Sequence, residues 1–88
     1  MVKKYKIVYF NTTGRGEPLR QVMRAGGISF EDYRLNPENM AMEKAEAPLG
    51  QFPYLEIIED DGTLKKFGES AAIMRFLGRL TNLYHHPL

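Results

Sequence analysis

The chain of 88 residues contains no cysteine, and it has almost no imbalance of charge. The absence of cysteine excludes disulfides, thiolate metal sites and a Cys-x-x-Cys redox pair. The sequence contains no apolar run long enough to predict a membrane span, and it shows no secretion signal. Twelve basic residues against eleven acidic ones leave a net charge of +1, which indicates neither nucleic acid nor a membrane as a partner. We therefore expect a cytoplasmic location.

Composition and hydrophobic periodicity instead indicate one small globular domain. The content is 43% hydrophobic and 26% charged, as in ordinary soluble domains. Asp61-Gly62 is typical of a two-residue hairpin turn between the last two strands. The pattern predicts a strand at 5–10, a helix at 17–25, a strand at 28–35, a short irregular helix within 36–49, strands at 54–59 and 63–67, and a helix at 70–80.

The order of these elements predicts an α/β fold. A βαβ unit followed by a ββα unit is the thioredoxin-like arrangement. The crossover makes the first two strands parallel, and the hairpin makes the last two antiparallel. We expect a four-stranded mixed sheet with helices on both faces. Residues 1–80 form the domain, and residues 81–88 form a tail or the start of a linker.

Pro53 stands where a loop should turn into a strand. A cis Phe52-Pro53 bond would fold the chain sharply and leave the backbone of Tyr54 unpaired on one side. Such an edge can bind an extended peptide by strand addition. The alternative is an ordinary trans proline at the start of an edge strand. The proline alone does not decide between them.

Glu69 and Ser70 precede the last predicted helix. The N–H groups of a helix N-terminus attract carboxylates, and the Ser70 hydroxyl could donate to the same anion. Glu69 could pair with an ammonium group, so the two residues suit the head group of an amino acid. The alternative is a plain N-cap serine with an acidic neighbour.

Tyr9 stands at the end of the first strand, where its hydroxyl could donate a hydrogen bond to a sulfur. A free thiol has a pKa of about 8.5, so one good donor would increase the thiolate fraction at neutral pH. The alternative is a half-buried strand tyrosine, as we expect for Tyr5.

Residues 5–11 (YKIVYFN) and 14–20 (GRGEPLR) resemble the N-terminal domain of glutathione transferases. The resemblance is closest to the sigma class, which includes the glutathione-dependent prostaglandin D synthases, and it extends to about Leu83. It implies that Tyr9 and Arg15 are catalytic. It places glutathione at Tyr9, Phe10, Arg15, Met40, Lys44, Gln51, Phe52, Pro53, Tyr54, Glu69 and Ser70.

The chain departs from the sigma pattern in two ways. Met40 stands where that class has a tryptophan, so an indole N–H donor to the glycyl end is absent. The chain also ends at Leu88, less than half of a family chain, without the helical domain that forms the electrophile pocket. The resemblance implies glutathione as co-substrate, no metal, and a small hydrophobic electrophile that is conjugated or isomerised, as in detoxification.

Two functions remain open from the sequence. One is a glutathione transferase domain that stabilises the glutathione thiolate, and whether this chain alone is an enzyme stays undecided. The other is a non-catalytic module that docks on a protein. The last helix bears on the second, because Ala71, Met74 and Gly78 form an apolar stripe beside the main stripe of Ile73, Phe76, Leu77 and Leu80. That second stripe predicts a homodimer or a helical protein partner.

Overall fold

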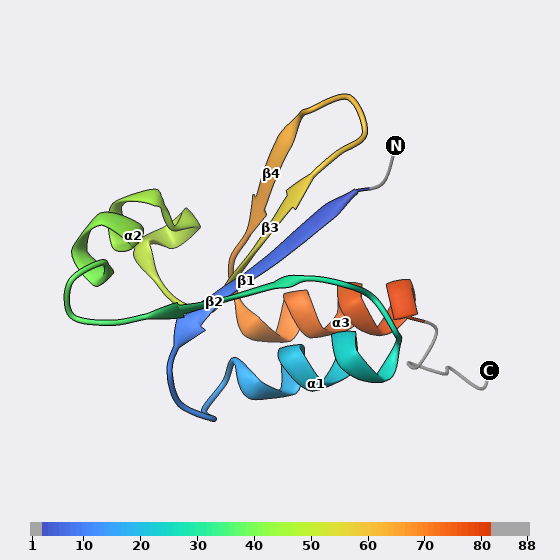
Figure 1. Cartoon of the computed structure of the whole chain (residues 1–88), viewed down its shortest axis with the longest axis horizontal. Helices are drawn as coiled ribbons and strands as arrows, with labels where there is room; N and C mark the ends of the chain where they lie inside the picture. The colour runs from blue at the N-terminus through green and yellow to red at the C-terminus, as the bar shows by residue number, and fades with distance from the viewer. Residues whose placement is uncertain (1–2, 82–88) are drawn as a thin grey trace.

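The computed structural model describes residues 3–81, and these residues form one sheet with three helices (Figure 1). No helix among them is long and apolar enough to cross a membrane. The elements in chain order are β1 Lys4–Phe10, α1 Glu17–Ala25, β2 Glu31–Leu35, α2 Met40–Glu46, the 3-10 turn η1 Pro48–Gly50, β3 Tyr54–Ile58, β4 Leu64–Phe67 and α3 Ser70–Thr81.

The four strands lie in the order β2-β1-β3-β4. β1 and β2 are parallel, with Val8 opposite Tyr33, and β3 and β4 are antiparallel. β1 and β3 are antiparallel, with Val8 opposite Tyr54. The mixed thioredoxin-like sheet predicted from the sequence is therefore confirmed.

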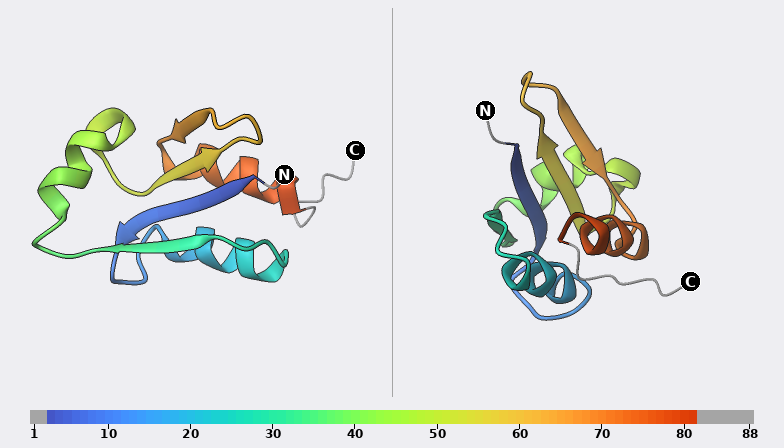
Figure 2. Two further views of the ribbon diagram at one scale, coloured as in Figure 1. Left: turned by 45° about the horizontal axis from the view of Figure 1, so that its top comes forward. Right: turned by 90° about the vertical axis from the view of Figure 1, so that its right-hand side faces the viewer.

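One face of the sheet packs on α1 and α3, which lie side by side (Figures 1 and 2). Alternate residues of a strand point to opposite faces, and Ile7 points to this one. It packs into the main core cluster, whose buried members are Ile7, Leu19, Met23, Leu55, Ile57, Ile73 and Leu77. This face therefore provides most of the burial that holds the domain together.

The opposite face packs on the segment that contains α2. Val8 points to this side and lies in a second buried cluster with Leu35, Ala47 and Tyr54. Ala47 follows α2 directly, so this cluster attaches the end of that helix to the sheet. The prediction of helices on both faces is confirmed.

The start of β2 differs from the prediction, because the strand begins at Glu31 and not at Ile28. The Ile28 N–H donates to the carbonyl of Met23 at 3.0 Å, and Gly27 has a φ of 70°. These contacts close the end of α1, so Ile28 cannot join the sheet. Ile28 and Phe30 pack on the main core cluster instead. Their apolar character therefore reports core packing rather than strand pairing.

The hairpin between β3 and β4 is present, but its turn is not the predicted two-residue Asp61-Gly62 turn. The Gly62 N–H donates to the carbonyl of Glu59 at 2.9 Å, and the Glu59 N–H donates to Thr63 at 2.8 Å. The loop is therefore three residues long, and only Gly62 has a positive φ, of 89°. A three-residue loop with glycine in the left-handed position is the alternative that the same sequence allows.

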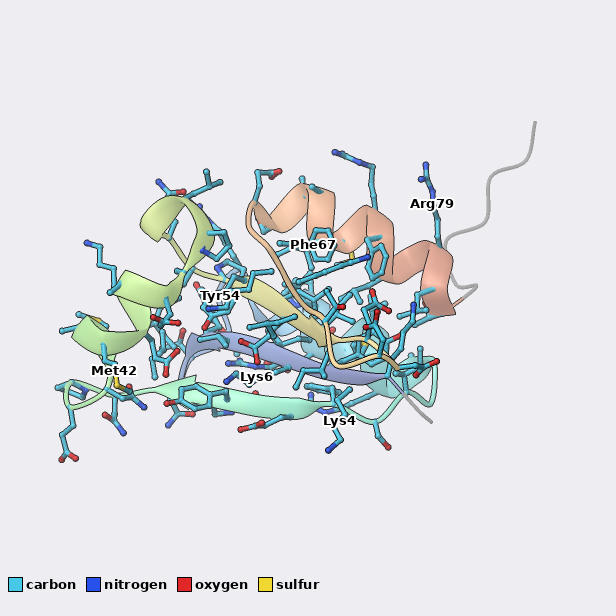
Figure 3. All side chains as sticks on the ribbon, turned by 90° about the horizontal axis from the view of Figure 1, so that it is seen from above. Lys4, Lys6, Met42, Tyr54, Phe67 and Arg79 are labelled. Carbon is cyan, nitrogen blue, oxygen red and sulfur yellow. The ribbon has the colours of Figure 1, made fainter. Side chains whose placement is uncertain are left out.

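The exposed side of α3 also differs from the prediction. Met74 is partly buried against the main core cluster and Gly78 is buried, so the stripe predicted as an interface mostly faces inward. Phe76 and Leu80, predicted to be core residues, are 38% and 37% exposed. Phe76 stacks on Phe67 of β4 with ring centroids 5.6 Å apart (Figure 3 shows Phe67 beside α3). α3 therefore has an exposed apolar side, but this side contains Phe76 and Leu80 and not the predicted stripe, and the predicted partner for it stays a prediction.

The predicted tail begins at Thr81, which is the last residue of α3. Residues 82–88 lie outside the described residues, so the boundary predicted at residue 80 stays a prediction.

Candidate functional site

Two adjoining cavities lie where β1 ends, β3 begins and α3 begins. The larger has a volume of about 330 Å³ and the smaller about 70 Å³, and Arg15, Gln51 and Phe52 line both. Of the residues predicted to bind glutathione, those that line one or both cavities are Phe10, Arg15, Met40, Lys44, Gln51, Phe52, Pro53, Glu69 and Ser70. Tyr9 and Tyr54 are the two predicted residues outside these walls.

A third cavity, of about 470 Å³, lies at the opposite end of β1. It is lined by residues such as Lys4, Phe30 and Ile58, and by none of the predicted site residues. Its size alone does not make it a site, and two of the charged side chains in its wall, Lys6 and Glu56, already pair with each other at 3.6 Å.

The segment 51–54 crosses between the two cavities and the sheet. The Phe52-Pro53 bond is cis. Tyr54 pairs with Val8 of β1, but the ladder between β3 and β4 begins only at Leu55. The backbone of Tyr54 therefore lies outside the β4 ladder beside the smaller cavity, as the cis interpretation of Pro53 predicted. This is the edge on which an extended peptide could add.

Tyr9 lies beneath the loop that joins β1 to α1. Its side chain is buried, and its hydroxyl oxygen accepts a hydrogen bond from the backbone N–H of Arg15 at 3.1 Å. Arg15 lines both cavities, so the Tyr9 hydroxyl is bonded to the backbone of a residue in their wall. The oxygen accepts from an amide, so its own O–H remains available as a donor.

Gly14 and Gly16 allow the loop to lie this close to Tyr9. A β-carbon at Gly14 would lie 2.4 Å from the Tyr9 hydroxyl oxygen, and one at Gly16 would lie 2.4 Å from Cγ of the same ring. Real β-carbons do not approach other atoms so closely. The sequence indicated only a flexible loop here, whereas the two glycines let the backbone pack tightly over the tyrosine.

Glu69 caps α3, which corrects the interpretation of this helix start. Its two carboxylate oxygens accept from the N–H groups of Ala71 at 2.8 Å and of Ala72 at 3.2 Å. Two of the helix N–H groups that were predicted to attract an anion, those of Ala71 and Ala72, are therefore already bonded to Glu69. The plain N-cap alternative for Ser70 is also wrong, since Glu69 is the cap. Ser70 is half-buried and lines the smaller cavity.

The helix α2 brings Met40 and Lys44 to the larger cavity, and a buried carboxylate fixes α2 to the sheet. The Tyr54 hydroxyl donates to Oε1 of Glu43 at 3.0 Å, and Glu43 is only 8% exposed. Burial, and then this bond to Glu43, raise the pKa of Tyr54. Figure 3 shows Tyr54 at the end of the sheet beside α2. The predicted role of Tyr54 was through its backbone, whereas its side chain anchors α2.

Sequence reasoning missed two residues that position the site. Glu43 was one of several acidic residues in an ambiguous helix, and nothing in the spacing distinguished it. Arg20 is fully buried beside the loop over Tyr9. Helical spacing did not distinguish Arg20 either, because it lies about 100° around the helix from Leu19, beside the apolar stripe, where an arginine is usually exposed.

Comparisons with known proteins agree with this geometry, although no protein-family model matches the chain. The class-mu 28 kDa glutathione S-transferase of Schistosoma japonicum is 38% identical over 78 residues, which are 89% of this chain and 38% of that protein. A sigma-class structure from Fasciola hepatica is 35% identical with a TM-score of 0.84, covering 91% of this chain and 38% of its own. A nu-class structure from Haemonchus contortus is 41% identical with a TM-score of 0.81, covering 92% and 37%.

The similar proteins come from the mu, sigma and nu classes, so the comparisons indicate the broad family and leave the class undecided. The chain spans less than two fifths of the length of each. Nearly the whole of this chain aligns with these proteins, and it resembles them in both sequence and fold. The chain is therefore homologous to the N-terminal, thioredoxin-like domain of the glutathione S-transferases.

Proposed function

We propose that this domain binds glutathione and stabilises its thiolate for reaction with an electrophile. The observation that carries the proposal is the convergence of the predicted residues on two adjoining cavities. Arg15 comes from the loop after β1, Lys44 from α2, Gln51 from the turn before β3, and Ser70 from the start of α3. Segments far apart in the chain thus meet at one site with an open strand edge.

The charges of the site suit glutathione, which has two carboxylates and one ammonium group. Arg15 and Lys44 supply two cations along the larger cavity, and Glu69 supplies a carboxylate at the smaller one. The γ-glutamyl head group would lie at Glu69 and Ser70, and the glycyl carboxylate would lie toward Lys44. The cysteinyl unit between them would pair with the backbone of Tyr54, with its sulfur toward Tyr9.

Thiolate stabilisation at Tyr9 is an electrostatic effect. The phenol O–H would donate to the sulfur, and the amide of Arg15 holds the phenol oxygen from the other side at 3.1 Å. A hydrogen bond to an ionised acceptor contributes about 1.5–3 kcal/mol in a partly dry site. The thiol proton would leave to water, so no further group has to accept it.

The proposal also covers the activity of the whole protein. It includes conjugation or isomerisation of a small hydrophobic electrophile, a role in detoxification, membership of the sigma class and a cytoplasmic location. The motif in residues 5–20 and the likeness to the Fasciola hepatica structure support the sigma class. The electrophile would contact the helical domain that the resemblance implies.

Glutathione titration of the 88-residue chain, followed by amide NMR, tests the proposal. Binding should shift the amides of Gln51, Tyr54 and Ser70 together, because they border the two cavities and the strand edge. The amides of β4 near Leu64 should not shift. An unchanged spectrum at millimolar glutathione, from a folded chain, would refute the proposed site.

We expect Ser70→Ala to weaken glutathione binding by about 1–2 kcal/mol, or roughly 5- to 30-fold in Kd, because the bound carboxylate loses a hydroxyl donor. S-methylglutathione should lose the same affinity, since this contact is remote from sulfur. Isothermal titration measures both. The cap of α3 belongs to Glu69, so the stability of the variant should be unchanged. Equal affinities in variant and wild type would remove Ser70 from the site.

A homodimer through the exposed side of α3 and β4 is also part of the proposal. Phe67, Phe76 and Leu80 are each more than a third exposed on neighbouring elements. We expect Phe76→Glu to weaken self-association by at least about 2 kcal/mol, as measured by sedimentation velocity, while the fold stays intact. Met74→Glu should instead destabilise the fold, because Met74 packs on the core. A wild-type chain that stays monomeric at high concentration would contradict the dimer.

A further inference from the structure

Arg20 is a fully buried arginine on α1 whose side chain has no exposed surface. A buried guanidinium is costly unless its N–H groups find partners inside the protein. No buried side-chain polar atom among residues 3–81 is without such a partner, so the charge of Arg20 is accounted for. The identity of the partners indicates what the residue does.

The two terminal nitrogens of Arg20 hold the backbone where β1 ends. Nη2 donates to the carbonyl oxygen of Phe10 at 2.8 Å, and Nη1 donates to that of Thr12 at 2.8 Å. Phe10 is the last residue of β1, and Thr12 lies in the loop that follows. The planar fork of an arginine can hold two carbonyls at once, which a lysine cannot do with the same geometry.

Two carboxylates fix the guanidinium itself. Nε donates to Oδ1 of Asp32 on β2 at 3.0 Å, and Nη1 also donates to Oε1 of Glu17 at 3.1 Å. Asp32 also accepts from Arg24 and Arg34, at 3.3 Å and 2.9 Å. Arg20 is thus held from β2 and α1 while it holds the loop.

The loop that Arg20 holds is the one that covers Tyr9. The guanidinium carbon of Arg20 lies 5.6 Å from the centroid of the Tyr9 ring. Beyond Thr12 the same loop supplies the Arg15 N–H that donates to the Tyr9 hydroxyl at 3.1 Å. Arg20 contacts neither cavity, so its effect on the site must pass through this loop.

We propose that Arg20 is a positioning residue for Tyr9. By holding the carbonyls of Phe10 and Thr12, it keeps the loop closed over the tyrosine ring. The Arg15 amide then fixes the phenol oxygen, and the phenol O–H is left to face the glutathione sulfur. The claim that Arg20 keeps the loop closed concerns the chain without ligand. The claim that the phenol O–H faces the glutathione sulfur rests on the proposed thiolate function.

The first measurement is hydrogen exchange of the Arg15 amide in the free 88-residue chain, followed by NMR. Arg20→Met removes the fork and the charge, and Arg20→Lys keeps the charge without the fork. In both variants the Arg15 amide should exchange at least about tenfold faster, while the amides of the main core keep their protection. Arg24→Met is the matched control, because Arg24 also bonds Asp32 but is half exposed and lies over Phe30. It should leave the Arg15 amide unchanged.

The second measurement is the pH at which bound glutathione ionises, followed by thiolate absorbance. In Arg20→Lys the pKa of the bound thiol should rise by about one unit, for example from about 6.5 to about 7.5, which lowers the thiolate fraction at pH 7 roughly threefold. The affinity for S-methylglutathione should change less than about twofold, because its carboxylates bind elsewhere in the site. A residue that acts only on stability would not separate these two readouts.

Each outcome of these measurements tests one part of the proposal. Arg15 exchange that is unchanged in Arg20→Lys, or raised equally in Arg24→Met, overturns the positioning role. If Arg20→Met does not fold, the folded Arg20→Lys variant still gives both readouts. If the wild type binds no glutathione, the proposed function fails, while the exchange data still decide whether Arg20 closes the loop over Tyr9. Faster exchange with an unchanged thiol pKa overturns the link from the loop to the sulfur.

Discussion

Tyr9→Phe should raise the pKa of bound glutathione by about two units, toward the free-thiol value of about 8.5. The change corresponds to about 2.7 kcal/mol of lost preference for the thiolate, and it leaves roughly 25-fold less thiolate at pH 7 if the pKa rises from about 6.5 to about 8.5. The physical reason is the loss of one donor in a site that the Arg15 loop shields from water. Spectroscopic titration of the bound thiol measures it directly.

The phenol also has a structural partner, which the experiment must separate from its chemistry. In Tyr9→Phe the Arg15 N–H loses its acceptor, so stability should fall by about 1 kcal/mol. Affinity for S-methylglutathione should remain nearly unchanged, because that ligand has no thiol to ionise. If the wild type binds glutathione with a thiol pKa still near 8.5, Tyr9 does not stabilise the thiolate in this chain.

The fold was predictable where short-range chemistry and topology agree. The helix at Glu17–Ala25 has its predicted bounds, because Pro18 suits the first turn and Gly26 and Gly27 end it. The parallel and antiparallel strand pairs follow from one crossover and one hairpin. Phe76 was misplaced because helical periodicity gives the spacing of a stripe, and only the position of β4 decides which stripe meets the sheet.

For the candidate site, the sequence predicted which residues take part but not the contacts that hold them in place. The resemblance named the residues around the cavities one by one, and the structure brings Gln51 and Ser70 to one wall although they are distant in the chain. It could not show that the Glu69 carboxylate caps α3, since the positive φ of 67° at that residue is a tertiary feature. Arg20 was equally hidden, because its backbone partners leave no trace in sequence spacing.

Gly16→Ala should destabilise the domain by about 2–3 kcal/mol, although its backbone alone favours the substitution. At φ −81° and ψ −22° an alanine is unstrained, so the smaller entropy of the unfolded chain would stabilise it by about 0.4–1 kcal/mol. The new β-carbon, however, would lie 2.4 Å from Cγ and 2.7 Å from Cβ of Tyr9. Those atoms are at the base of the side chain and cannot swing away, so the loop or β1 must move. Urea unfolding gives the free energy.

A double-mutant cycle identifies the cause. Tyr9→Ala removes the ring, including Cγ and Cδ2, and leaves only the Cβ contact, so Gly16→Ala in that background should cost about 1–2 kcal/mol less than in the wild type. The bound thiol pKa should also rise in the single variant, since a displaced loop releases the phenol. A stabilised Gly16→Ala variant would mean that the loop does not lie against Tyr9, and the positioning of the phenol by Arg15 and Arg20 would then fail with it.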